Sequence, residues 1–180
     1  MNLPLLKKER NIIMHYNLNK IIIIFLIFIL CGCNIINNDN EEPNSRYVYL
    51  IEMLKEHSSY ESSSDYFDID VEIATINDGY RYYVIIDKPT LAMYDIEMMA
   101  IEPDKDYTET MAANIGIFDE KEYNMIPNQS NSEAGFVKGL VASGTTDKSE
   151  ITLHVYVQFK NADFTNVHNE FIEISGKYEG

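Results

Sequence analysis

The most reactive side chains in this 180-residue sequence are two cysteines, Cys31 and Cys33, which directly follow an apolar run from Ile21 to Leu30. A thiolate is a strong nucleophile, so a cysteine at the end of such a run is a candidate for covalent modification. The rest of the chain has no cysteine. It therefore cannot form a disulfide, and its apolar core must hold it together.

Leu30-Cys31-Gly32-Cys33 resembles the lipobox of bacterial lipoproteins, with an aliphatic residue first, small residues next and a cysteine last. The resemblance implies that residues 1–32 are a signal peptide and that a signal peptidase cuts after Gly32. It also implies that Cys33 carries a diacylglyceryl thioether on the extracytoplasmic face of a membrane. Cys31 is the competing position, but it follows Leu30, which is larger than the small residue that such peptidases read.

The length of the apolar run favours a signal peptide over a membrane span. The run of ten residues fits the core of a secretory signal, which is typically about 7–15 residues long, and Lys20 supplies the positive charge before it. A spanning helix needs about 20 apolar residues, so a stop-transfer anchor is the lesser alternative. Each buried methylene contributes about 0.8 kcal/mol and two acyl chains anchor stably. We therefore expect lipid to hold the protein at the cell membrane.

The chain is strongly acidic, with a formal net charge of −15. The leader holds four basic residues and one acidic residue, so its removal leaves ten basic and 28 acidic residues, a net charge near −18. Nucleic acid and anionic lipid headgroups should repel such a chain, and we expect neither as a partner. Solubility is one explanation for the charge, and an affinity for divalent cations or basic proteins is the other.

Two segments precede the expected folded domain. Residues 33–44 are polar and acidic, which is typical of a flexible tether with a reach of about 20 Å. Residues 45–64 predict an amphipathic helix to residue 57 and then a serine-rich connector. One face of this helix carries apolar residues at helical spacing: Tyr47, Leu50, Ile51 and Leu54.

From Tyr66 the apolar period changes to two, which predicts a β-hairpin around Asp78-Gly79. A two-residue loop made of Asp78 and Gly79 puts Val71, Ile73 and Thr75 on one buried face with the residues opposite them. Those opposite residues are Ile86, Val84 and Tyr82.

Further alternating segments predict strands over residues 92–100, 114–118, 135–143, 151–159 and 171–175. Six or seven strands with regularly spaced turns indicate that residues 65–180 form an antiparallel β-sandwich of immunoglobulin-like size. The fold class is therefore mainly β with a short N-terminal helix. The pattern leaves the strand order open.

The second face of the predicted hairpin is half apolar, although a face that meets only water should be polar. Ile76, Tyr83 and Ile85 make it a candidate surface for binding a protein partner, since tyrosine offers a large contact area with few torsions to freeze. The alternative is that the helix at residues 45–57 covers this face and makes it core.

Three aspartates on the same face form a candidate metal site. The predicted register places Asp70 opposite Asp87, with Asp68 two residues along, and like charges across a strand pair are destabilising. Calcium would relieve this repulsion because it prefers carboxylate oxygens. A salt bridge from Lys88 or Arg81 would relieve it more simply.

The sequence contains no motif that predicts catalysis. His57, His154 and His168 lack the spacing of metal ligands, and His154 is expected on the sheet surface beside Tyr156. The acidic run from Glu102 to Glu109 lacks the spacing of a calcium loop and predicts a solvated loop. The polar loop at residues 127–132 is either a plain turn or a contact for a peptide or glycan.

Two functions agree with these features. The first is a non-catalytic, lipid-anchored module of the cell envelope that binds a protein partner. The second is an extracytoplasmic binding module for a small ligand, a glycan or calcium. The first predicts that a charge at Tyr83 or Ile85 abolishes partner binding without unfolding the domain.

Overall fold

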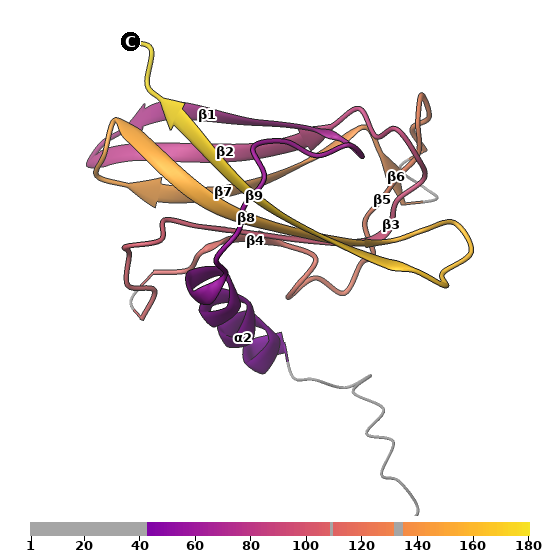
Figure 1. Ribbon diagram of the computed structural model, residues 1–180. Coiled ribbons are helices and arrows are strands. Elements are labelled where there is room, and N and C mark those ends of the chain that lie inside the picture. Colours follow the sequence, from indigo (N-terminus) through magenta and orange to yellow (C-terminus); the bar gives the residue numbers. More distant parts are fainter. Residues whose placement is uncertain (1–42, 109, 132–134) are drawn as a thin grey trace, which may run out of the picture. The chain divides into compact units, whose positions relative to one another are not determined.

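A computed structural model describes residues 43–108, 110–131 and 135–180 of the chain. The predicted signal peptide, Cys33 and nearly all of the predicted tether lie outside these residues. Figure 1 shows the described elements from helix α2 to strand β9. The described chain is mainly β with one helix, as the sequence predicted.

Most of the strands form two antiparallel sheets. The three-stranded sheet has the order β1 (Asp68–Ile76), β2 (Gly79–Asp87), β7 (Gly139–Thr146). The four-stranded sheet has the order β4 (Ala113–Ile115), β3 (Tyr94–Ile101), β8 (Glu150–Lys160), β9 (Val167–Lys177). Two short parallel strands, β5 (Asn124–Met125) and β6 (Phe136–Val137), form a separate pair.

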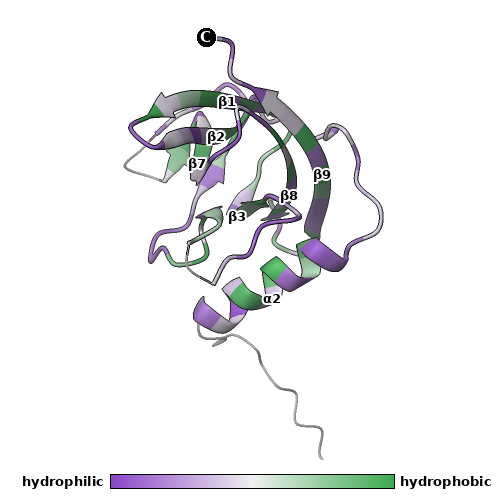
Figure 2. Cartoon of the chain, turned by 90° about the vertical axis from the view of Figure 1, so that its left-hand side faces the viewer, coloured by the Kyte–Doolittle hydropathy of each residue, from purple (hydrophilic) through white to green (hydrophobic). Residues whose placement is uncertain are grey.

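The main core lies between the two sheets, which Figure 2 shows one above the other. Alternate residues of each strand point inward and are fully or almost fully buried: Tyr82, Val84 and Ile86 from β2, and Ile151, Leu153, Val155, Val157 and Phe159 from β8. Burial of one such side chain contributes about 1.5–3 kcal/mol. This layer holds together a domain that has no disulfide, and the predicted β-sandwich is confirmed.

The β1–β2 hairpin has the predicted faces but not the predicted register. Ile76 pairs with Gly79, so Asn77 and Asp78 form the loop. Of these residues only Gly79 has a positive φ, at +117°, whereas the predicted turn requires positive φ at Asp78 as well. The register shift is two residues, so each side chain keeps its face and changes its neighbour across the pair.

Helix α2 (Pro43–Glu56) packs on the side of the four-stranded sheet that faces away from the three-stranded sheet, and forms a second core there (Figure 2). The predicted apolar face of the helix is buried: Leu50 and Leu54 are fully covered and Tyr47 almost so. Since β3 is covered from both sides, Met98 to Ile101 are all buried, and the strand is continuously apolar there rather than alternating.

Polar contacts fix α2 to this sheet. Arg46 Nη2 donates to Glu97 Oε2 at 2.9 Å and to Gln158 Oε1 at 3.0 Å, and Tyr47 Oη accepts the N–H of Ala112 at 2.7 Å. No helix in the described part of the chain is long and apolar enough to cross a bilayer.

The other predicted strands are present with altered bounds. The strand predicted at residues 135–143 is divided between β6 and β7, and the segment predicted to begin at residue 171 belongs to the longer β9. Strand β5 was not predicted, because a strand of two residues has no measurable period. The segment after α2 joins the four-stranded sheet at its edge, where the N–H of Glu61 donates to Phe171 O at 2.9 Å.

Candidate binding face

The solvent-facing side of the three-stranded sheet is the main candidate site, and we call it the outer face. Its members alternate with the core residues along each strand: Asp68, Asp70, Glu72, Ala74 and Ile76 on β1, Arg81, Tyr83, Ile85 and Asp87 on β2, and Val141, Ser143 and Thr145 on β7. The predicted surface residues Ile76, Tyr83 and Ile85 all belong to it.

The structure brings Tyr83 and Ile85 together with a residue that the sequence did not single out. Val141 lies opposite Ile85 on β7 and is 51% exposed. The three side chains make an apolar patch on β2 and β7. Ile76, 39% exposed, lies at the turn end of β1, away from this patch. Val141 could not be found from sequence because nothing in the sequence indicates that β7 pairs with β2.

Helix α2 does not cover the outer face. It packs on β3 and β8, on the opposite side of the sandwich, as the two views in Figures 1 and 2 both show. The alternative prediction, in which the helix makes the hairpin's second face into core, is therefore wrong. Its physical reason is that β3 and β8 carry a second apolar surface, and the helix buries that surface instead.

The aspartates of the candidate metal site are arranged differently from the prediction. Asp68 lies opposite Asp87, while Asp70 lies opposite Ile85. Lys88 Nζ is 2.8 Å from Asp68 Oδ2 and 3.9 Å from Asp87 Oδ1, so a lysine compensates the facing carboxylates. This interaction with two carboxylates raises the pKa of Lys88.

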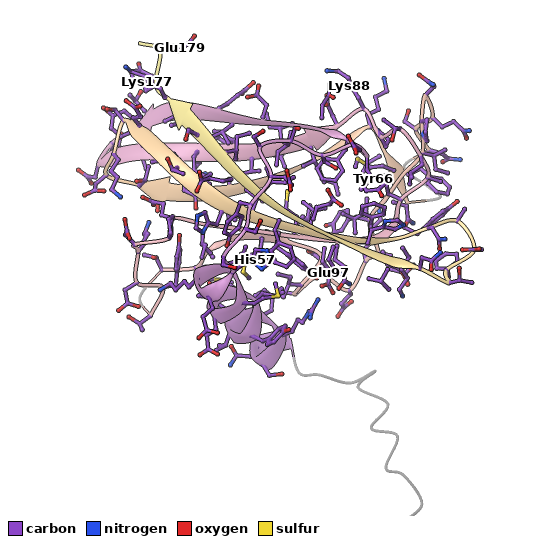
Figure 3. The ribbon with its side chains drawn as sticks, in the orientation of Figure 1. His57, Tyr66, Lys88, Glu97, Lys177 and Glu179 are labelled. Carbon is purple, nitrogen blue, oxygen red and sulfur yellow. The ribbon has the colours of Figure 1, made fainter. Side chains whose placement is uncertain are left out.

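Figure 3 labels Lys88 at the end of the three-stranded sheet, on the side away from α2. No group of three or more His, Cys, Asp or Glu residues that could hold a metal occurs in residues 43–108, 110–131 and 135–180. The structure thus supplies the lysine that the sequence offered as the simpler alternative to calcium.

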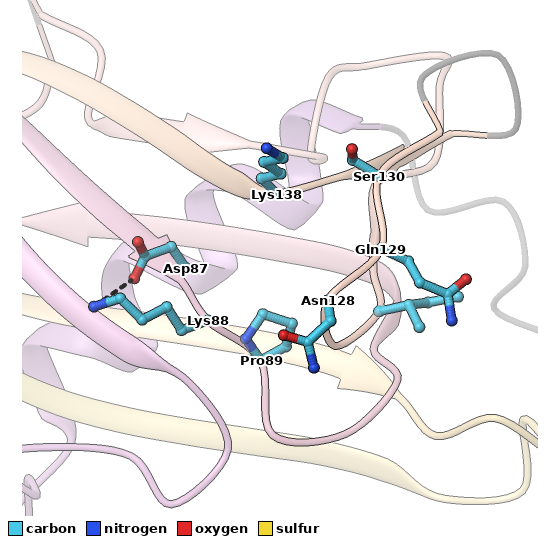
Figure 4. A pocket seen from close by; sticks show the side chains of 8 residues that line it. Asp87, Lys88, Pro89, Asn128, Gln129, Ser130 and Lys138 are labelled. Carbon is cyan, nitrogen blue, oxygen red and sulfur yellow. Dashed lines mark ion pairs between the residues drawn. The ribbon is translucent and has the colours of Figure 1, made fainter.

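The predicted polar loop borders a cavity of about 510 Å³ at the end of the same sheet. Figure 4 shows its lining, with the Asp87–Lys88 ion pair on one side and Asn128, Gln129 and Ser130 on the other. These side chains point in different directions and do not converge on a common point. This arrangement favours a plain turn over a contact for a peptide or glycan at residues 127–132.

His154 is not the surface residue that the sequence predicted. The Tyr60 ring stacks on it at 3.9 Å and its side chain is 15% exposed. Its Nε2 lies 3.2 Å from Glu173 Oε2, and its Nδ1 lies 3.4 Å from the carbonyl oxygen of Leu54. Through these contacts His154, on β8, connects the end of α2 to Glu173 on β9.

Glu102 is likewise buried, at 3% exposed, where the sequence predicted a solvated loop. Lys105 Nζ and Lys148 Nζ each lie 3.3 Å from its carboxylate, and the hydroxyl of Thr146 donates to it at 3.2 Å. Burial raises the pKa of the neighbouring Tyr107 to about 12, and its hydroxyl accepts the N–H of Glu102. Every oxygen of this carboxylate is thus occupied by the protein itself.

Comparisons with known proteins identify no relative. No protein-family model matches the chain, and neither the curated proteins nor the solved structures contain a match.

Exposure of the outer face predicts a sharp contrast between two neighbouring isoleucines. Ile85→Lys should change the free energy of unfolding by less than about 1 kcal/mol, because the ammonium can reach water. Ile86→Lys should lower it by about 4 kcal/mol or more, because Ile86 is fully buried between the sheets. Chemical denaturation of the two variants measures the difference, and equal destabilisation would show that the outer face is core.

Proposed function

We propose that this protein is a lipid-anchored module of the bacterial cell envelope that binds a protein partner through its outer face and performs no catalysis itself. The observation that carries the proposal is the apolar patch of Tyr83, Ile85 and Val141. Val141 is 51% exposed, and Tyr83 and Ile85 are partly exposed beside it on the solvated side of the sheet. Such a patch is typical of surfaces that another protein covers.

The packing of the two sheets supports this assignment. The four-stranded sheet is packed on both sides, whereas the three-stranded sheet is packed on one side by the described residues. Helix α2 buries the second apolar surface of the four-stranded sheet, where it covers Met99 and Tyr156. An apolar patch left outside that arrangement is available for another molecule.

Anchoring through Cys33 predicts a difference between the two cysteines. Cys33→Ser should abolish incorporation of a clickable fatty acid and release the protein from the membrane fraction, while Cys31→Ser should change neither. The serine oxygen cannot form the thioether that holds the lipid. Equal labelling of wild type and the Cys33→Ser variant would contradict lipidation at this residue.

Partner binding at the outer face predicts a position-specific cross-link in living cells. A photo-cross-linking amino acid in place of Tyr83 should give one discrete adduct of defined mass, because the side chain lies in the interface. The matched control replaces Tyr49, an exposed tyrosine on α2 that is 52% accessible and lies on the opposite side of the sandwich.

Two results would contradict the proposal. One is the absence of any adduct at position 83. The other is the same adducts at positions 83 and 49, which would show collision rather than binding. The adduct at position 83 should also disappear when Ile85→Lys is added, since the lysine interrupts the apolar patch while the domain remains folded.

A further inference from the structure

The outer face has a second property besides its apolar patch: carboxylates lie directly beside that patch on β1. The register aligns Asp70 with Ile85 and Val141 in one row across the sheet. The next row aligns Glu72 with Tyr83 and Ser143. In both rows an acidic side chain on β1 flanks an apolar side chain on β2, so a molecule that contacts the patch also contacts the carboxylates.

Neither of these two carboxylates has a cation of its own within ion-pair distance among the described residues, although Asp70 adds to the negative charge that raises the pKa of Lys88. Lys88 is engaged with Asp68 and Asp87, and neither Asp70 nor Glu72 forms a salt bridge within the described residues. The outer face carries a single arginine, Arg81, which lies opposite Ala74 towards the turn. Asp70 and Glu72 are both exposed. Their charge is therefore directed at solvent and at whatever covers the patch.

A cavity of about 460 Å³ lies where the carboxylates and the patch meet. Its lining combines hydrogen-bonding and acidic groups with apolar surface: Ser62, Ser63, Ser64, Asp68, Asp70, Glu72 and Asp87, and the apolar Phe67, Ile69 and Ile85. Lys88 also lines it, where it pairs with Asp68 and Asp87 and leaves Asp70 and Glu72 without a salt bridge among the described residues. Lysine and arginine match such a lining, because their aliphatic stems pack on apolar surface while their charged ends reach carboxylates.

We infer that the outer face binds a basic protein segment, which lays an apolar side chain on Tyr83, Ile85 and Val141 and places a lysine or arginine against Asp70 and Glu72. The inference rests on the proposed function and names the chemistry of the partner. The apolar contact supplies most of the affinity, and the complementary charge selects the partner and speeds its encounter. An acidic or purely polar segment would lack one of the two contacts.

The test uses full-length protein in non-ionic detergent and three dye-labelled peptides of ten residues. The first peptide carries three lysines and two leucines in a serine background, the second replaces the lysines with glutamates, and the third replaces the leucines with serines. Fluorescence anisotropy should detect binding of the first peptide alone. The Ile85→Lys variant should lose that binding.

A matched pair of double variants locates the charge that matters. Asp70→Asn with Glu72→Gln should weaken binding of the first peptide roughly three- to ten-fold, the effect of removing two surface ion pairs. Glu52→Gln with Glu56→Gln removes the same charge from exposed positions on α2, away from the outer face, and should leave binding unchanged. Asparagine at position 70 can still accept the N–H of Val71, as Asp70 does at 2.8 Å.

The outcomes separate this inference from the proposed function. Equal weakening by both double variants would show attraction to the net charge of the chain and overturn the inference. Failure of the lysine–leucine peptide to bind would overturn it as well. In either case, a specific cross-link at position 83 in cells would leave the proposed function standing, whereas its absence would overturn the proposed function too.

Discussion

The fold depends on the burial of the four-stranded sheet from both sides. Strands β3 and β8 have an apolar surface towards the three-stranded sheet and a second one towards α2. The described residues contain no cysteine, so no disulfide can compensate there for a missing layer, and the helix covers the second surface. Arg46 and Tyr47 add directional hydrogen bonds that fix where it lies. The position of α2 therefore follows from the second apolar surface of β3 and β8, which the helix buries.

This requirement has a consequence for the three-stranded sheet. One helix cannot cover two sheets that face opposite directions, and the described chain contains one helix. Tyr83, Ile85 and Val141 are thus left outside both cores. The packing of α2 on the four-stranded sheet therefore stabilises the domain and also leaves the outer face of the three-stranded sheet available for binding.

The sequence predicted elements better than it predicted their arrangement. Local periodicity was enough for α2, for the faces of the β1–β2 hairpin and for the sandwich class, because each depends on neighbours in the chain. The hairpin register was wrong by two residues because positive φ is confined to Gly79, which favours a different turn. The site of α2 was open from sequence, since an amphipathic helix shows which face it buries and not what covers that face.

Errors about single residues have the same origin. Val141 joins the patch through the pairing of β7 with β2, which links segments more than fifty residues apart. His154 was expected in solvent because a polar residue at an alternate position of a strand normally faces water, and Glu102 was expected there because it begins an acidic run that predicts a solvated loop. The structure places Tyr60 over His154 and two lysines on Glu102, and both contacts come from distant or irregular segments.

If a protein partner covers the outer face in the cell, residue 83 is shielded there, and the reactivity of a thiol at this position measures that shielding. Beyond the lipobox the chain has no cysteine, so Tyr83→Cys introduces a unique reporter in the folded domain. Its rate of reaction with a membrane-permeable maleimide is measured in cells and in the purified protein. Coverage by a partner predicts fast labelling of the purified protein and slow labelling in cells. Equally fast labelling in both would contradict it.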